Sequence, residues 1–429
     1  MTETLVQKRA RLLGPNLPTF YEQPVHLVKG QGQYLWDVDG RKYLDCYNNV
    51  PHVGHCHPKV VQAICDQAAT LNTHTRYLHD GIVDYAERLT ATFDDSLDTM
   101  LMTCTGSEAN DVALRMAQAV TGNTGIIATD FTYHGNTLAV SQLSRTKPPI
   151  GGYWDNMAFV PAPDSYRPLG GQAGMAHAHA FAAEVQARID VLQEKGHGVS
   201  ALVICPFFAN EGFPDLPKGW LAPAIKAVRD AGGIIIADEV QPGFGRLGSH
   251  FWGHERIGFT PEIATIGKPM ANGHPVGAVI AGHDTMAAFR NAFGYFNTFG
   301  GNPVSMAACL ATLEVIEGEG LQQNAAQVGA YAKTCLQELA AQHDCIGDVR
   351  GAGLFFGAEM VVDRAQKIPA PLFTKQVANE MRQRGVLLNF LGRHGNVLKM
   401  RPPMVFTREN VDQMISALDE VLGQARATA

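Results

Sequence analysis

The sequence predicts an α/β protein in which helices flank a mostly parallel sheet, with a second, smaller α+β domain. Two observations carry this prediction. Short apolar, β-branched runs alternate with segments of helix length between residues 99 and 237, and after about residue 303 the pattern changes to long helices and strand pairs. Such alternation is typical of a parallel sheet covered on both faces. A chain of 429 residues is long enough for two domains or for one elaborated α/β domain.

Three regions follow along the chain. Residues 1–58 are expected to form an arm and a small β-meander that packs with the C-terminal domain. Residues 59–302 are expected to form the large domain, and residues 303–429 the small α+β domain. In the large domain we expect strands at 99–103, 125–129, 201–205 and 233–237, helices at 59–69, 109–120, 176–194 and 219–231, and a long surface loop at 148–175.

Composition excludes several classes of protein. The net charge is −7, and no Lys/Arg-rich block occurs, which argues against nucleic-acid binding and against anionic membrane surfaces. The first residues lack the apolar core of a signal peptide, and no apolar segment has the length of a membrane span. The eight cysteines are scattered without a CxxC pair, so we expect reduced thiols in a cytoplasmic protein.

The most informative residues are an acid and a lysine at the ends of two apolar runs. Residues 234–236 lead to Asp238, and residues 263–266 lead to Lys268. Ligands of open α/β sheets bind at the carboxyl ends of strands. A lysine that forms a Schiff base with an aldehyde, beside a carboxylate that keeps a pyridine nitrogen protonated, is the pair that pyridoxal phosphate chemistry requires. An ordinary ion pair is the alternative that these two residues leave open.

Three further segments offer ligands for such a cofactor. In TCTGSEANDVALRMAQAV, Gly106 and Ser107 stand at a helix start, where N–H groups and a hydroxyl either bind a phosphate or cap the helix. In DFTYHGNT, Tyr133 is a candidate for stacking on the cofactor ring. In NTFGGNPVS, Thr298 is a candidate phosphate donor, although Asn302-Pro303 equally marks a helix start.

Two other patterns are interpreted as structural. Three glycines after residue 238 match the dinucleotide-binding motif, but RLGSHFWGHE, which follows them, has no helical apolar stripe. A histidine cluster flanked by prolines has residue types that bind metals, yet its close spacing fits a loop equally well, and no metal is expected. This cluster consists of His52, His55, His57 and Cys56.

Together, these motifs resemble the class III aminotransferases, which have the fold-type-I architecture and use pyridoxal 5′-phosphate. The resemblance runs from about residue 34 to the C-terminus. It implies that Lys268 is the Schiff-base lysine and that Asp238 holds the pyridine nitrogen. It also implies that Val240 presses on the ring face opposite Tyr133, and that Gln241 lies near the ring's phenolic oxygen.

The resemblance also implies an assembly. Gly106 and Ser107 would bind the cofactor phosphate of their own subunit, while Thr298 would reach the phosphate of a neighbouring subunit. A homodimer, or a tetramer built from such dimers, with shared active sites is therefore expected.

The chain departs from the family's commonest form at two places. Many members carry a Glu-Pro-Val-x-Gly run where this chain has CPFFANEG (205–212), so that Glu211 falls some five positions late. Most members have an arginine three residues before a Pro-Pro pair, where Lys399 stands here, with Arg401 directly before the pair. Lysine cannot reproduce a bidentate arginine clamp, so the usual recognition of an α-carboxylate is not expected.

The segments YNNVPHVGHCHP, NTHTRYLHD, GKPMANGHPVGAV and LKMRPPMVF resemble a narrower subgroup, which contains alanine–glyoxylate aminotransferase 2 and related phospho-lyases. The candidate substrate residues are Asn49, Arg76, Lys399 and Arg401. We expect a transaminase that moves a terminal amino group from an amine or ω-amino substrate to a keto acid. The alternative is a lyase that eliminates phosphate, ammonia or both from a phosphoethanolamine-like or aminophosphonate substrate, because both reactions need the same lysine and aspartate.

Overall fold

The computed structural model describes residues 3–424 and contains a seven-stranded sheet with the order β4-β10-β9-β8-β7-β5-β6. Five neighbouring strands, from β9 to β6, run parallel, and β10 is antiparallel to both of its neighbours. The predicted mostly parallel sheet is therefore confirmed. The strands are β4 (Thr99–Thr103), β5 (Ile126–Thr129), β6 (Met157–Val160), β7 (Ala201–Ile204), β8 (Ile234–Asp238), β9 (Ile263–Ile266) and β10 (Gly277–Ala281).

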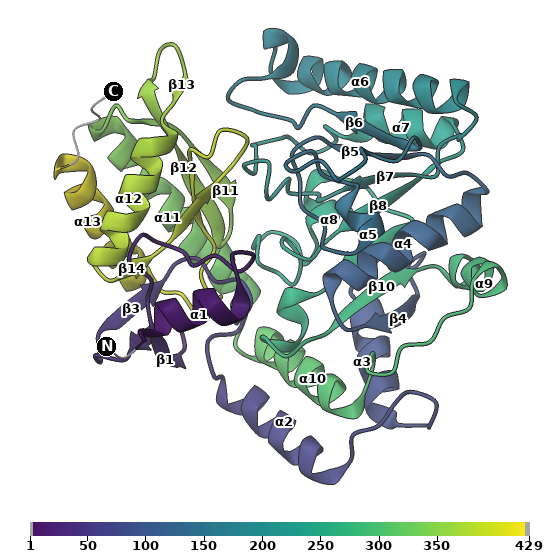
Figure 1. Cartoon of the computed structure of the whole chain (residues 1–429), viewed down its shortest axis with the longest axis horizontal. Helices are drawn as coiled ribbons and strands as arrows, with labels where there is room; N and C mark the ends of the chain where they lie inside the picture. Colours follow the sequence, from purple (N-terminus) through teal and green to yellow (C-terminus); the bar gives the residue numbers. More distant parts are fainter. Residues whose placement is uncertain (1–2, 425–429) are drawn as a thin grey trace.

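Helices cover both faces of this sheet (Figure 1). Successive strand residues point to opposite faces, so Ile235 packs in a cluster with Phe181 of α6, whereas Ile236 packs in a cluster with Met116 of α4. This explains why the strands are apolar at every position rather than at alternate positions. The helices of this part are α2 (Pro58–Thr70), α3 (Asp80–Thr90), α4 (Gly106–Thr121), α5 (Leu138–Ser141), α6 (Gly174–Glu194), α7 (Ala222–Asp230), α8 (Gly253–Ile257) and α9 (His283–Ala292).

The remaining elements, apart from α10, form a smaller α+β region on the left of Figure 1, whereas α10 packs against α2 and α3 of the large region. One sheet has the order β11-β12-β16-β15, and β13 pairs with β12. A second sheet, β1-β2-β3-β14, joins the N-terminal meander to the C-terminal part, because β3 pairs in parallel with β14. The strands are β1 (Leu27–Gln31), β2 (Tyr34–Asp37), β3 (Lys42–Asp45), β11 (Ile346–Ala352), β12 (Phe355–Asp363), β13 (Ile368–Pro369), β14 (Val386–Leu387), β15 (Asn389–Leu391) and β16 (Val397–Met400). Helix α10 spans Pro303–Gly318, and the helices of the smaller region are α1 (Leu5–Leu13), α11 (Leu321–Gln342), α12 (Pro371–Gln383) and α13 (Arg408–Gln424).

Several elements differ from the sequence-based expectation. The stretch 148–175, expected to be a loop throughout, contains β6, which pairs in parallel with β5 at the edge of the large sheet. Strand β10 and helix α9 were not expected, and α7 begins at Ala222, three residues later than expected. An edge strand of four residues gives little periodicity to detect, and β10 lies directly behind a glycine-rich turn.

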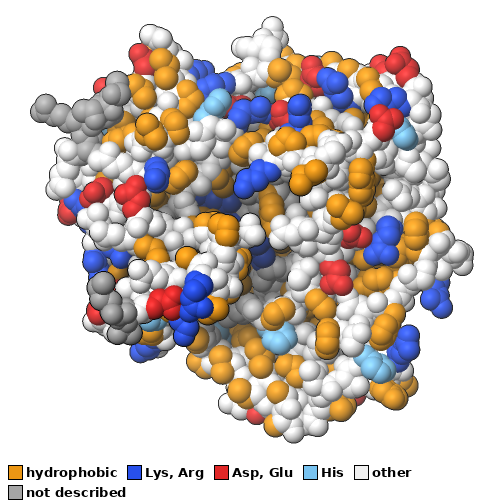
Figure 2. Space-filling view, in the orientation of Figure 1, with side chains coloured by type: hydrophobic (Ala, Val, Ile, Leu, Met, Phe, Trp, Pro, Cys, Tyr) orange, Lys and Arg blue, Asp and Glu red, His pale blue; other side chains and the backbone are white. Residues whose placement is uncertain are grey.

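The surface carries no single dominant charge. Acidic and basic side chains are mixed over the face shown in Figure 2, and this face is hollowed near its centre, between the two regions. Within residues 3–424, no helix combines the length and the apolar character needed to cross a membrane.

Candidate active site

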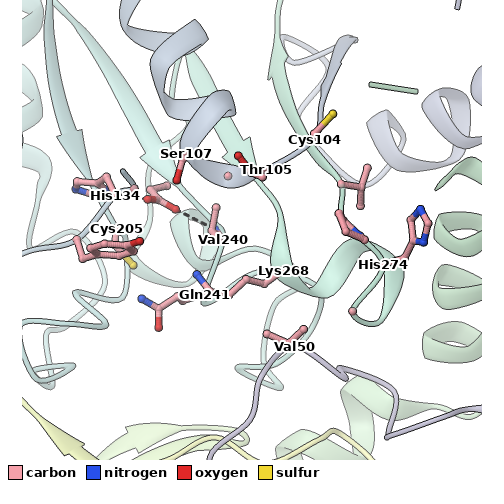
Figure 3. Close-up of a pocket in the computed structure, with 17 residues that line it drawn as sticks. Val50, Cys104, Thr105, Ser107, His134, Cys205, Val240, Gln241, Lys268 and His274 are labelled. Carbon is pink, nitrogen blue, oxygen red and sulfur yellow. Dashed lines mark hydrogen bonds and ion pairs between the residues drawn. The ribbon is translucent and has the colours of Figure 1, made fainter. Parts of the chain in front are cut away.

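The site lies where β8 and β9 end side by side. Asp238 is the last residue of β8 and pairs in register with Thr265 of β9. Lys268 follows two residues after β9, at the first position of the short 3₁₀ turn Lys268–Ala271. Both residues line a cavity of about 260 Å³ (Figure 3). The predicted neighbouring strand ends are thus present in the structure, and the two side chains face one space.

Asp238 is held by a buried network. Its Oδ2 accepts hydrogen bonds from His134 Nδ1 at 2.6 Å and from Asn110 Nδ2 at 3.0 Å, while Oδ1 accepts from the backbone N–H of Val240 at 3.0 Å. Asn110 is itself oriented by Thr265, whose hydroxyl donates to Asn110 Oδ1 at 2.7 Å. Three donors therefore fix the carboxylate at the mouth of the strand, where a protonated ring nitrogen would need an acceptor.

Sequence reasoning missed both side-chain partners of Asp238. Asn110 lies four residues after Gly106 on α4 and is 2% exposed, so it is a polar residue on the helix face that packs against the sheet. His134 directly follows the stacking candidate Tyr133. A polar residue within an apolar helical stripe was the one signal for Asn110, because buried polar groups need partners. For His134, only its position beside Tyr133 offered a signal.

The Lys268 amine is tuned by its surroundings. Burial lowers the pKa of Lys268, and the positive charge of Arg401 lowers it further, while the charge of Asp238 opposes the shift. A lowered pKa increases the fraction of neutral amine, which is the form that acts as a nucleophile and as a base. Figure 3 shows the Lys268 side chain extending from its turn toward Val240 and Gln241.

The start of α4 forms a cradle for an anion. Gly106 and Ser107 occupy the first turn of the helix and line the cavity. A Cβ placed on Gly106 would lie 2.9 Å from Val240 Cγ2, so the backbone approaches the site closely only because this residue is glycine. Ser107 Oγ accepts a hydrogen bond from the backbone N–H of Asn136 at 3.1 Å, which leaves its own proton available for a phosphate oxygen.

Tyr133 borders the same cavity. The residue is 50% exposed, and its hydroxyl donates to Asn136 Oδ1 at 3.1 Å. Val240 lines the cavity as well. An acid, a lysine, an anion cradle and two side chains suited to sandwiching a ring are therefore grouped as pyridoxal 5′-phosphate requires.

Beyond Gln241 lies a pair of buried cations. Lys399 is 2% exposed and Arg401 is 7% exposed. Lys399 Nζ donates to Gln241 Oε1 at 3.1 Å and to the backbone carbonyl of Ala209 at 3.2 Å, and Arg401 Nη1 donates to the same Gln241 oxygen. Burial lowers the pKa of both side chains, and for Lys399 the charges of Arg401 and Lys268 add to the fall.

This cation pair lacks a counter-charge. Among residues 3–424, no carboxylate lies within ion-pair distance of Lys399 or Arg401. Arg401 Nε and the amide nitrogen of the buried Asn49 also have no hydrogen-bond partner within the described part of the chain. Buried donors without acceptors are costly, so the site is complementary to an anionic group.

Five predicted residues are not among those that line this cavity. Asn49, Lys399 and Arg401 are buried, whereas Arg76 and Thr298 are exposed. The Arg76 guanidinium stacks over the Phe296 ring at 4.0 Å. The same exposed surface carries Tyr77, Leu78 and Phe299, which are 67%, 104% and 70% exposed.

The histidine cluster has local partners. His52 is fully buried, accepts a hydrogen bond from Arg246 at Nδ1 and donates from Nε2 to the Phe244 carbonyl. His55 pairs with Asp45. The His52 contacts tie the meander to residues 244–246, whereas the His55–Asp45 pair lies within the meander itself. The glycines of the dinucleotide-like motif lie in a turn that precedes the five-residue helix α8.

Comparison with known proteins gives consistent findings. The family model described as aminotransferase class-III matches residues 19–422. An alanine–glyoxylate aminotransferase 2-like protein of Drosophila melanogaster is 42% identical over 98% of this chain and 87% of its own length. Ethanolamine-phosphate phospho-lyase homolog 1 of Caenorhabditis elegans is 36% identical over 98% of this chain and 93% of its own length. A phospholyase from Arthrobacter, solved in complex with phosphoethanolamine, has a TM-score of 0.94 and 43% identity, and the match covers 99% of this chain and 100% of that one.

Proposed function

The chain belongs to the class III aminotransferase family and uses pyridoxal 5′-phosphate, and from this premise we propose that it is a lyase acting on a phosphoethanolamine-like amine. The net reaction converts phosphoethanolamine and water into acetaldehyde, ammonia and phosphate. Elimination was the sequence-based alternative to transamination. The buried cation pair Lys399–Arg401 is the observation that favours elimination.

The charge of this pair suits a phosphate monoester. Such a group carries between one and two negative charges at neutral pH and accepts several hydrogen bonds at once. Lys399 and Arg401 provide buried donors that lack a carboxylate partner in the described chain, and Arg401 Nε has no hydrogen-bond partner there. A single carboxylate would leave part of this donor capacity unused. Desolvated cations without an anion are costly, so their retention indicates a ligand that neutralises them.

The chain's own residues supply the remaining steps. Bound pyridoxal 5′-phosphate supplies an electron sink for the carbon that bears the substrate nitrogen. The Lys268 amine takes the proton from this carbon, and Asp238 keeps a proton on the ring nitrogen. The adjacent C–O bond breaks, its electron pair leaves with the phosphate, and Lys399 and Arg401 stabilise the charge that develops there. One water then hydrolyses the carbon–nitrogen bond of the two-carbon product, so that its oxygen becomes the aldehyde oxygen and the nitrogen leaves as ammonia.

Transamination is the second candidate, and the relative from Drosophila melanogaster favours it, because its name is that of an aminotransferase. The two buried cations would then bind the carboxylate of a keto acid. The same Lys268 would return the proton to the cofactor, and the amino group would pass to the keto acid. The substrate classes in this case are a terminal amine and a keto acid.

One pair of incubations separates the two reactions. Purified enzyme is incubated with phosphoethanolamine alone, and separately with ω-amines and pyruvate. We expect acetaldehyde and inorganic phosphate from the first incubation without any keto acid. Alanine from the second incubation, together with no phosphate from the first, would overturn the proposal in favour of transamination. Lys268→Ala is expected to lose the visible absorbance of the lysine-bound cofactor and all turnover in either case.

We also propose a homodimer, or a tetramer of such dimers, in which Thr298 reaches the cofactor phosphate of the partner. Thr298 is exposed and outside its own cavity, and the surface with Tyr77, Leu78 and Phe299 offers apolar area for a second copy. A cytoplasmic location is inferred from the eight free cysteines, which are usual in reducing compartments.

A further inference from the structure

Glu211 is a buried acid that the steps above do not use. The residue is 8% exposed, and its Oε1 accepts a hydrogen bond at 2.7 Å from the hydroxyl of Thr129, the last residue of β5. Its Oε2 accepts from the backbone N–H of Asn210 at 3.1 Å. Burial raises the pKa of Glu211, while the Thr129 hydrogen bond and the nearby His134 counteract the rise. The side chain therefore anchors its own loop to the end of a sheet strand.

The neighbouring loop residues contact the cation site. The Ala209 carbonyl accepts from Lys399 Nζ at 3.2 Å, and Asn210 Oδ1 accepts from Gln241 Nε2 at 3.3 Å. Gln241 in turn accepts from Lys399 and Arg401. Two adjacent loop residues thus hold Lys399, which the proposed function assigns to the substrate anion, and Gln241, which accepts hydrogen bonds from both cations.

This loop does not hold its shape through regular secondary structure. Phe208 and Phe213 have φ angles of 48° and 41°, which are unfavourable for bulky residues, and Gly212 has a φ of 112°. At the far end, the Gly212 carbonyl accepts from Arg350 Nε at 2.7 Å. A strained segment keeps one conformation only where anchors determine it, and Glu211 and Arg350 provide them.

We infer that Glu211 is a specificity-determining positioning residue, which fixes residues 209–212 against β5 and so holds Lys399 and Gln241 in the geometry that binds the substrate's anionic group. The inference rests on the proposed function for the identity of that group. Glu211 acts through Ala209 and Asn210, so its loss affects anion binding, whereas the hydrogen bonds that hold Asp238 come from His134, Asn110 and Val240 and do not involve this loop.

The test uses the holoenzyme and inorganic phosphate as the probe. The dissociation constant of phosphate is measured by calorimetry, KM and kcat for phosphoethanolamine are measured by acetaldehyde release, and the visible absorbance reports the lysine-bound cofactor. Glu211→Ala is expected to weaken phosphate binding and to raise KM by about tenfold each, because a buried anchoring interaction is lost. The effect on kcat is expected to be smaller, and the absorbance band is expected to persist.

Companion variants separate positioning from general damage. Thr129→Val removes the hydroxyl that holds Glu211, so it should weaken phosphate binding and raise KM as Glu211→Ala does. Thr129→Ser keeps the hydroxyl and should bind phosphate as tightly as the wild type. Glu211→Gln keeps one acceptor oxygen, so its affinity for phosphate should lie between those of the wild type and Glu211→Ala. The matched control is Glu262→Gln, because Glu262 also anchors a strand, through a 2.8 Å bond from Ile235 N–H, but lies away from the cavity.

Wild-type phosphate affinity in both Glu211→Ala and Thr129→Val would overturn the inference, as would a fall in kcat at unchanged KM and affinity. An equal loss of affinity in Glu262→Gln would also overturn it. Failure of the proposed function appears instead in the wild-type enzyme alone, as the absence of acetaldehyde from phosphoethanolamine. The two failures are therefore distinguishable.

Discussion

Lys399→Met removes one buried cation while keeping an unbranched side chain. In the wild type, Lys399 Nζ lies 3.1 Å from Gln241 Oε1 and 3.2 Å from the Ala209 carbonyl. Losing a hydrogen bond between this ammonium group and a substrate phosphate should cost about 1.5–3 kcal/mol, which lowers kcat/KM for phosphoethanolamine by about 10- to 150-fold. Steady-state acetaldehyde release measures this change. Lys226→Met, at an exposed position on α7, is the matched control and should keep wild-type kcat/KM.

Although Lys399→Met should lower activity, it should raise the stability of the fold. Burial lowers the pKa of Lys399 well below 10.5, so the unfolded chain holds this proton more tightly than the folded chain does. The free energy of unfolding of the wild type therefore rises with pH between the lowered pKa and 10.5. Because Lys399→Met removes the cost of burying a cation, its Tm should exceed that of the wild type at neutral pH, by a margin that shrinks as pH approaches 10.5.

A lower kcat/KM combined with a higher Tm in Lys399→Met distinguishes a functional cation from a packing residue. A general packing defect would lower activity and stability together, whereas loss of a functional cation lowers activity and raises Tm. A Tm for Lys399→Met below the wild-type value at neutral pH would refute the account of a costly buried charge. Unchanged kcat/KM in the same variant would refute the assignment of Lys399 to the substrate anion.

Three further predictions concern the cofactor site. Asp238→Asn should lower kcat by about 10³-fold or more and weaken cofactor binding, because the carboxylate no longer holds a proton on the ring nitrogen; single-turnover kinetics and cofactor titration of the apoenzyme measure both effects. Gly106→Ala should weaken cofactor binding, since its Cβ would lie 2.9 Å from Val240 Cγ2, and adding Val240→Ala should recover much of the loss in a double-mutant cycle. Dimers mixed from Lys268→Ala and Thr298→Ala subunits should contain one site with both Lys268 and Thr298 and regain activity that neither parent shows at limiting cofactor; no gain on mixing would contradict a shared site.

The large sheet could be predicted from the sequence because its determinants are local. The apolar runs that end at Asp238 and Lys268 each identify a strand within a few residues. The rule that ligands bind at the carboxyl ends of strands then brings the two side chains together. The register of β8 with β9 confirms that these strands are neighbours. By contrast, β10 enters antiparallel between β9 and β4, and no local pattern reveals strand order of that kind.

The hydrogen-bond network around Asp238 was not predictable in the same way. Asn110 and His134 reach Asp238 across sequence separations of 128 and 104 residues. Each is a common residue type in an ordinary local context. Only the packing of α4 and of the loop after β5 against the end of β8 places them there. Partners of this kind follow from tertiary structure, whereas Asp238 itself follows from the strand that carries it.

The departures from the family pattern fall together in space although they are far apart in the sequence. Ala209, in the loop at 205–212, and Lys399 are 190 residues apart in the sequence, yet in the structure the Ala209 carbonyl accepts a hydrogen bond from Lys399. A lysine ammonium is a single charged nitrogen on a flexible stem, whereas an arginine guanidinium is a rigid fork. Fixed acceptors are therefore needed to hold the lysine nitrogen in one position. The altered loop provides one acceptor directly and positions Gln241 as the other. The two departures therefore meet at one place in the structure, where the altered loop orients the altered cation.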